Sequence, residues 1–326
     1  MNSKVLLFFL YCTICFAQNS IDSNERKNEK LDIQEFKING DMVFQYEKPK
    51  LFDFITKLPN DFGIMGEMFI QKNNMIWFGA SIGATLAIIP IDQKVTDNSR
   101  NFGNQIGFQP DHTYSGPIKI FPKDANSAIY RLGNGFTVIL VGGGLLVYGL
   151  SNNDYRAMHT SSELLEGIIA SGILVQPLKR ITGRESPFIA EQNGNVGGAW
   201  RPFPSFSAYQ KNTPSYDAMP SGHLTTLMTS VIILSENYKE VKWIKPVGYS
   251  LMGLMSFEML QSKVHWLSDY PLAIFMGYII GKSIVKSRIT EKTNTLIGMP
   301  KKFKPKYNYS FSSNQNFTLA GINITF

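Results

Sequence analysis

Two histidines of this chain stand in sequence contexts that suit proton transfer or nucleophilic attack, among only four histidines in all. His223 follows Pro-Ser-Gly in DAMPSGHLTT, at the predicted start of a helix, and His265 precedes Asp269 by four positions in VHWLSDYPLA. On a helix, that spacing puts both side chains on one face. The carboxylate can then hold one imidazole nitrogen and leave the other as a nucleophile or base. A histidine bonded to an aspartate for structure alone would have the same spacing.

A cluster of basic residues upstream could bind an anion. Lys179, Arg180 and Arg184 lie in LKRITGRESPF, directly after an apolar helical stretch. Clustered cations of this kind bind phosphate or carboxylate groups. A basic helix end without a ligand has the same composition, so this segment indicates an anion-binding site only in combination with the two histidines.

The residues before His223 complete a set of groups that phosphoryl transfer needs when no metal takes part. Ser221 is a natural N-cap, and Gly222 lets a phosphate oxygen approach the backbone at the positive end of the following helix. His265 could then attack phosphorus while His223 protonates the leaving oxygen.

From about Leu132 to Val285 the chain resembles the superfamily of type 2 phosphatidic acid phosphatases and vanadium haloperoxidases. The family signature has three parts: Lys, six residues, then Arg-Pro; Pro-Ser-Gly-His; and Ser-Arg, five residues, His, three residues, Asp. The resemblance implies an all-α bundle without a cofactor, acting on a phosphorylated substrate that in many members is a lipid. It implies the following roles: His265 as the phosphorylated nucleophile, Asp269 as its orienting partner, His223 as the general acid, and Lys179, Ser221 and Gly222 as phosphate-binding groups.

The chain departs from this signature at both arginines. Ser186 stands where the first motif has its arginine, and Met259 stands where the third motif has its own. Each lost charge-assisted contact is worth roughly 3 kcal/mol in the transition state. Arg184 and Arg201, the latter in AWRPFPSF, are the predicted replacements, whereas Lys263 is expected to point partly away on a helix.

Three other functions compete with a metal-independent phosphatase. The first is a catalytically weakened relative that binds anionic lipid or serves the cell envelope, which the missing arginines favour and the intact histidines oppose. The second is a vanadate-dependent haloperoxidase, against which the missing arginines count more heavily. The third is a zinc site, for which the spacing gives no support. His112 and His159 have no partner motif, and no aromatic-and-basic module indicates nucleic-acid binding.

The first residues indicate export. A short basic start and the apolar run Val5–Phe16 precede Ala17, which is the layout of a cleaved signal peptide. An uncleaved anchor is the alternative. Both cysteines, Cys12 and Cys15, lie within this leader, so the exported chain would have neither a disulfide nor a cysteine-ligated metal.

The elements that must position the site are apolar helices between two hairpins. The predicted helices are Met75–Ile91, Leu132–Leu150, Leu164–Val175, His223–Leu234, Val247–Leu260 and Tyr270–Val285. Alternating patterns predict one hairpin around Asn39-Gly40 and another around 313–316, and the second is expected to pair with the first or to pack on the helices. The domains are a signal peptide (1–17), a polar exported region (18–74), a helical phosphatase domain (75–285), and a basic tail with a terminal hairpin (286–326).

Charge and hydropathy suggest a membrane location. Leu132–Leu150 is uncharged and long enough to span a bilayer. Between 282 and 306, eight basic residues stand against one glutamate, which suits a solvated tail, a cytoplasmic flank or an anchor to anionic lipid head groups. The sequence favours five spans behind an exported N-terminal region, with the site facing outward, and Met75–Ile91 is then not a span. A wholly exported, soluble periplasmic bundle is the alternative.

Overall fold

The computed structural model describes residues 32–108, 122, 124–293, 306–314 and 317–325. The predicted signal peptide, with Cys12 and Cys15, lies outside these residues, as does His112. The described chain is mostly helical with a small antiparallel sheet, so the predicted all-α bundle with small hairpins is confirmed.

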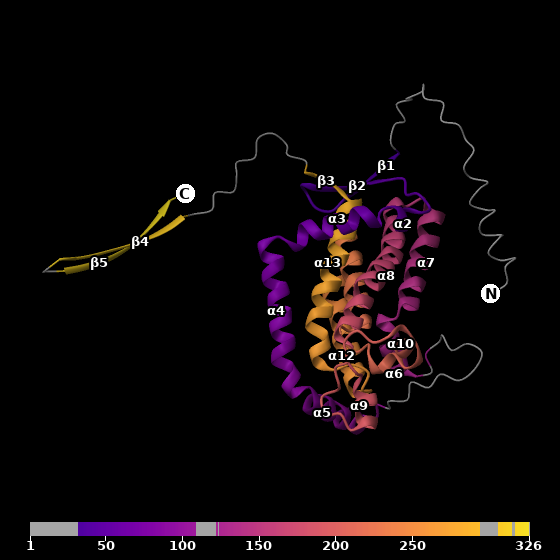
Figure 1. The fold of residues 1–326 in the computed structure, drawn as a ribbon. Helices are drawn as coiled ribbons and strands as arrows, with labels where there is room; N and C mark the ends of the chain where they lie inside the picture. The colour runs from indigo at the N-terminus through magenta and orange to yellow at the C-terminus, as the bar shows by residue number, and fades with distance from the viewer. Residues whose placement is uncertain (1–31, 109–121, 123, 294–305, 315–316, 326) are drawn as a thin grey trace. The chain divides into compact units, whose positions relative to one another are not determined.

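Six helices run between two ends of the described body (Figure 1). They are α4 (Lys72–Ile88), α7 (Gly135–Asn152), α8 (Tyr155–Thr182), α11 (Gly222–Asn237), α12 (Ile244–Gln261) and α13 (Tyr270–Arg288). Each contains or overlaps one predicted helix. The ends follow local capping chemistry: the Asp154 carboxylate accepts from the Ala157 N–H at the start of α8, and Gly183 ends α8 in a left-handed conformation.

Shorter elements connect these helices. Before α4 come α2 (Asp53–Thr56) and α3 (Leu58–Phe69), and after it come the 3-10 turn η1 (Ile89–Ile91) and α5 (Asp92–Gln105). Next are α6 (Ala125–Tyr130) and η2 (Arg131–Gly133). The segment between α8 and α11 contains α9 (Pro187–Asn193), α10 (Phe206–Lys211) and η3 (Thr213–Ser215), and η4 (Leu267–Asp269) precedes α13. The polar helix α5 has no counterpart among the predicted helices.

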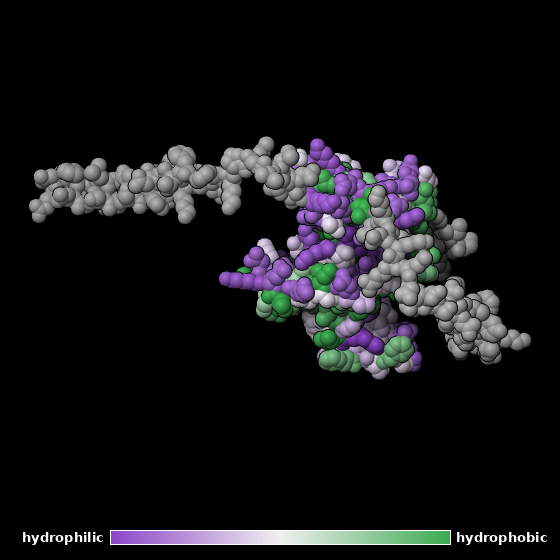
Figure 2. All heavy atoms as spheres, turned by 90° about the horizontal axis from the view of Figure 1, so that it is seen from above, coloured by the Kyte–Doolittle hydropathy of each residue, from purple (hydrophilic) through white to green (hydrophobic). Residues whose placement is uncertain are grey.

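A three-stranded sheet closes one end of the described body, which we call the sheet end. The strands β1 (Ile33–Lys37) and β2 (Met42–Glu47) form the predicted hairpin, with Phe36 opposite Phe44. The Asn39 side chain accepts from two backbone N–H groups of the turn. The third strand, β3 (Thr290–Thr293), follows α13 and pairs antiparallel with β2. Hydrophilic residues predominate where Figure 2 looks onto this end.

The C-terminal strands β4 (Lys306–Asn314) and β5 (Phe317–Thr325) pair with each other, which confirms the second predicted hairpin. The prediction that this hairpin pairs with the first one is wrong, because the described partner of β2 on that side is β3. The strand directly after α13 is nearer along the chain and occupies the edge of the sheet.

The β2–β3 pairing bears on the predicted number of spans. Six long helices (α4, α7, α8, α11, α12 and α13) lie between the two strands, so the chain enters and leaves the bundle at the same end. Five spans would instead leave the two strands at opposite ends. The helical segment Lys72–Gln105, which contains α4, and α7 are long and apolar enough to cross a membrane, with only 11% and 17% of their most apolar stretch buried. The sequence-based topology excluded Met75–Ile91 as a span. Among the described residues, this segment lies in one of the two candidate spans.

Candidate active site

The packing of α11 against α13 fixes the two histidines relative to each other. Both helices start at the end opposite the sheet, which we call the cavity end, where the Ser221 N–H before α11 donates to the Asp269 carbonyl before α13. Gly277 on α13 allows this close approach, because a Cβ there would lie 2.6 Å from the Thr225 carbonyl oxygen of α11. The Thr225 and Thr229 hydroxyls donate to the carbonyls of Ala273 and Gly277, each at 3.3 Å. The start of α11, with His223, therefore lies beside the loop that leads into α13.

His265 lies in the loop between α12 and η4, not on a helix as the sequence suggested. Its Nδ1 lies 2.7 Å from the Ala218 carbonyl oxygen and 3.4 Å from Asp269 Oδ2. Because both neighbours are hydrogen-bond acceptors, we assign the ring proton to Nδ1. Nε2 then keeps its lone pair, the arrangement required of a nucleophile.

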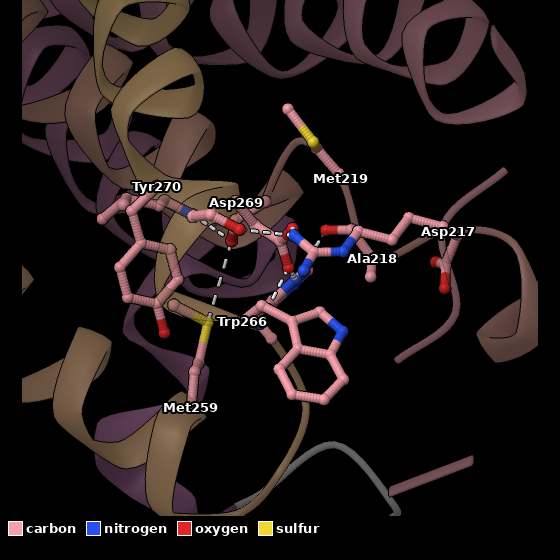
Figure 3. A network of polar contacts seen from close by, with 12 residues as sticks. Asp217, Ala218, Met219, Met259, Trp266, Asp269 and Tyr270 are labelled. Atoms are coloured by element: carbon pink, nitrogen blue, oxygen red, sulfur yellow. Dashed lines mark hydrogen bonds and ion pairs between the residues drawn. The ribbon is translucent and has the colours of Figure 1, made fainter. Parts of the chain in front are cut away.

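Asp269 is held from several sides, as Figure 3 shows for its contacts near Trp266 and Ala218. Its Oδ2 accepts from the Trp266 backbone N–H at 2.8 Å, and its Oδ1 accepts from Arg184 Nη1 at 2.7 Å. The side chain is fully buried. A carboxylate fixed in this way sets the orientation of the His265 ring.

Arg184 joins two buried carboxylates instead of facing the cavity. Besides Asp269, its guanidinium donates to Asp92 Oδ2 at 2.7 Å and to Ser268 Oγ at 2.5 Å. The Ser268 hydroxyl also contacts Asp92. Arg184 is fully buried and is absent from the cavity lining, so the structure does not place it as a phosphate ligand. Its contacts make it a positioning residue for Asp269.

Arg201 is likewise occupied elsewhere. Its Nη1 donates to Glu185 Oε1 at 3.1 Å, and it too is absent from the cavity lining. Gly183 brings this loop close to α8, since Arg201 N–H donates to the Gly183 carbonyl and a Cβ at Gly183 would overlap Arg201. Arg201 thus ties the loop to the bundle.

Glu185 makes this loop sensitive to acid. Burial opposes its ionisation, but donation from the Ala199 N–H, the amides of Asn195 and Asn193, and Arg201 lowers the pKa of Glu185 below its ordinary 4.5. Since this pKa is lower in the folded chain than in the unfolded one, the ionised group stabilises the fold fully above about pH 4.5. That contribution is lost as the pH falls through the folded-state pKa.

We therefore expect the melting temperature of the wild type to fall more steeply in acid than that of Glu185→Gln. Thermal unfolding of both proteins, measured from neutral pH down to about pH 3, tests this. Parallel pH profiles for the two proteins would contradict the role of Glu185.

A cavity of about 780 Å³ brings several of the predicted site residues together. Three predicted site residues, Lys179, His223 and His265, line it together. The rings of His223 and His265 lie 6.3 Å apart between centroids, and the Tyr130 ring packs on His223 at 4.6 Å. The other lining residues are Arg100, Ser186, Phe188, Glu191, Pro214, Asp217, Ser262, Lys263 and Val264.

Ser221 and Gly222 lie at the start of α11, directly before His223, and neither is among the residues that line the cavity. The fully buried Ser221 hydroxyl accepts from the Leu224 N–H at 3.4 Å as the predicted N-cap of α11, and it lies 3.9 Å from Met259 Sδ. A Cβ at Gly222 would lie 3.7 Å from Lys179 Nζ. The bare backbone at Gly222 is therefore next to a cation at the positive end of a helix, where an anion is stabilised.

Two cations that sequence reasoning did not choose complete the lining. Arg100 comes from α5, and Lys263 follows the end of α12. Lys263 does not continue the helix: its φ of 59° turns the chain, which brings the side chain to the cavity. A left-handed lysine is strained, and such strain is common at functional sites. Ser186, at one of the missing arginine positions, lines the same cavity.

Each lysine of the cavity has a carboxylate neighbour. Lys179 Nζ lies 3.3 Å from Asp217 Oδ2, and Lys263 Nζ lies 2.7 Å from Glu191 Oε1. Arg100 donates to the Gln261 carbonyl at 3.3 Å. An incoming anion would therefore have to share these lysines with Asp217 and Glu191.

Lys263 offers a clean test because glycine accepts its backbone conformation. We expect Lys263→Gly to keep or raise the melting temperature while weakening the binding of inorganic phosphate or vanadate by roughly tenfold or more, the value of one charge-assisted contact. Lys263→Asn, which also tolerates a left-handed backbone, should behave alike, and Lys211→Ala, an exposed lysine outside the cavity lining, serves as the control. Unchanged anion affinity in both Lys263 variants would remove Lys263 from the site.

Fold and site together define an all-α protein with two histidines and several cations around one cavity. Residues 161–292 match the family model of the PAP2 superfamily. No curated protein and no solved structure gives a significant match to the chain. The matched segment contains all three motifs. Asp92 and Arg100, which also contribute to the site, lie outside it.

The other described histidine lies far from this site along the bundle. His159 is near the start of α8, with Nε2 2.8 Å from the Glu47 carbonyl oxygen at the sheet end. Its contact is with β2, consistent with a structural role.

Proposed function

We propose that this protein is a metal-independent phosphatase that works through a phosphohistidine. The match of residues 161–292 to the PAP2 superfamily supports phosphatase chemistry in general. The observation that carries the finer proposal is the position of His265 Nδ1 between two acceptors, in a cavity shared with His223 and three cations. This geometry leaves Nε2 as the nucleophile.

The reaction proceeds in two steps. The Nε2 lone pair of His265 attacks phosphorus, the bond from phosphorus to the leaving oxygen breaks, and protonated His223 gives that oxygen its proton. In the second step neutral His223 takes a proton from water, and the resulting hydroxide attacks the phosphohistidine. The bond from phosphorus to Nε2 then breaks, inorganic phosphate leaves, and both histidines return to their starting states.

The cations hold the phosphoryl oxygens through both steps. Lys179 and the backbone at Gly222 bind at the start of α11, and Lys263 and Arg100 stand in for the arginines that the motifs lack. Donors placed in advance around a developing charge contribute roughly 3 kcal/mol each. The apolar lining residues Phe188 and Val264 support a substrate with an apolar group, such as a lipid phosphate.

The experiment is phosphate release by the purified protein, in the presence of EDTA, from p-nitrophenyl phosphate, phosphatidate and a polyprenyl diphosphate. Turnover on any of them supports the phosphatase, and the preferred substrate distinguishes lipid from soluble chemistry. A folded protein without turnover on all three would instead favour the catalytically weakened, anion-binding relative. The pairing of both cavity lysines with carboxylates is the observation that favours that second candidate.

We also propose that the bundle spans a membrane with the cavity end outside. Exposed apolar side chains cover α4 and α7, and an 18-residue helix such as α7 rises about 27 Å, close to the thickness of the hydrocarbon core. Lysines gather at the sheet end and favour a cytoplasmic location for it; they are Lys239, Lys242, Lys245, Lys282 and Lys286. In this topology residues 18–74 are not exported, unlike in the sequence-based prediction.

Single cysteines test this orientation, because both natural cysteines lie in the leader and can be replaced by serine. In intact cells, a membrane-impermeant maleimide should label Lys211→Cys, at the end of α10, and should label Asp41→Cys, in the turn between β1 and β2, only after permeabilisation. Labelling of Asp41→Cys alone would invert the topology. Labelling of both would show a wholly exported bundle.

A further inference from the structure

A second, larger cavity lies between α4 and α13, away from the histidines. Its volume is about 1440 Å³. Along α13 its lining runs from Pro271 to Lys286, and 15 residues of helix rise about 22 Å, more than the roughly 15 Å of hydrocarbon in one leaflet. We call this cavity the α4–α13 groove.

The α4–α13 groove is amphipathic along its length. The α4 side presents the small residues Ala80, Ser81 and Ala84, which leave room for an occupant, while Ile274 and Phe275 face it from α13. All charged lining residues gather at the sheet end, and they are Glu236, Lys239, Lys282, Lys286 and Glu291. One end is thus charged, and the remainder is uncharged and largely apolar.

The charged lining consists of three lysines and two glutamates, and Lys239 also pairs with Glu291 at 2.9 Å. Three lysines share the nearly buried carboxylate of Glu236: Lys245 and Lys282 at 3.0 Å and Lys239 at 3.6 Å. Lys286 is exposed, and no carboxylate of the described residues lies within ion-pair distance of it. An occupant with an anionic head and an apolar tail would match both ends of the groove.

We propose that the α4–α13 groove binds an anionic phospholipid, with the acyl chain along α4 and the headgroup at Lys282 and Lys286. This inference rests on the proposed membrane location and is independent of the catalytic reaction. A second copy of the chain fits less well, because two such grooves packed side by side would bring their lysines together. The basic tail is also a poor occupant, since it has the same sign of charge as the groove end.

Trp77 provides the readout, since it lines the groove, is 68% exposed, and is one of only four tryptophans. The full chain is placed in phosphatidylcholine nanodiscs with increasing fractions of acyl-brominated phosphatidylglycerol or acyl-brominated phosphatidylcholine. The quenching of Trp77 emission is obtained by subtracting the quenching measured for Trp77→Phe from the quenching measured for the wild type. We expect the fraction of brominated lipid that gives half-maximal quenching to be at least about fivefold lower for phosphatidylglycerol than for phosphatidylcholine.

Lys286→Ala is expected to weaken this preference by about fivefold, the share of one lysine near a lipid surface. Lys242→Ala removes a charge from the same end, outside the groove lining, and should leave the preference unchanged. Turnover of p-nitrophenyl phosphate is measured in the same samples, so a failure of lipid binding is distinguished from a failure of catalysis. Equal quenching by both lipids, no quenching by either, or equal losses in Lys286→Ala and Lys242→Ala would each overturn the proposal.

Discussion

Replacing His265 with alanine is expected to lower phosphate release by about 10⁴-fold or more, as removal of a covalent nucleophile does in other enzymes. The reason is geometric: the contacts of His265 Nδ1 with the Ala218 carbonyl and Asp269 orient the ring, so that the Nε2 lone pair is available in the cavity. Initial rates on the preferred substrate measure the effect. A residual rate within tenfold of the wild type would exclude His265 as the nucleophile.

A second variant separates lost chemistry from lost folding. In His265→Asn the side-chain amide can still donate to the Ala218 carbonyl, so we expect near-normal stability without turnover. Rapid quenching of the wild type with ³²P-labelled substrate in alkaline detergent should trap base-stable, acid-labile radioactivity on the protein, and neither variant should retain any. Label on the protein in the His265→Asn variant would place the covalent step on another residue.

Replacing Arg184 with methionine is expected to have the largest effect on stability. Its guanidinium is the shared partner of two fully buried carboxylates, Asp92 and Asp269. Removing one member of such a network leaves uncompensated buried charge and costs about 3–5 kcal/mol of unfolding free energy. Denaturant unfolding in a fixed detergent measures this loss. Turnover of the variant that remains folded should also fall, because Asp269 loses a support.

Arg201→Met is the matched control. Its side chain is 39% exposed, and its partner Glu185 keeps donors from two asparagines and a backbone N–H, so we expect a loss of only about 1 kcal/mol. Asp92→Asn added to Arg184→Met should recover part of the loss by removing one unpaired charge. Equal losses for Arg184→Met and Arg201→Met would contradict the buried network.

The sequence predicted the long apolar helices and both hairpins, because periodicity and turn residues are local signals. It did not predict α5, whose residues are mostly polar. The four-residue spacing of His265 and Asp269 correctly indicated contact, although a loop and a 3-10 turn, not a helix, bring the two together.

The role of the cations required the folded structure. Arg184 is close in sequence to the missing arginine at Ser186, but the burial of Asp92 and Asp269 draws its side chain away from the cavity. Lys263 was expected to point away, because the end of α12 at Gln261 and the left-handed turn after it are not evident from composition. Arg100 precedes the first motif by many residues, and only tertiary packing brings it to the site.

The pairing of β2 with β3 also bears on the order in which the chain assembles. Gln45 and its partner Thr290 are separated by nearly the whole helical region. At ordinary rates of synthesis, about 5–20 residues per second, β2 leaves the ribosome roughly 10–50 s before β3 exists. During that interval one edge of the hairpin lacks its neighbour and is open to incorrect pairing. The three-stranded sheet is therefore completed last. A chain truncated before Thr290 would keep every proposed catalytic group but would lack the third strand of this sheet.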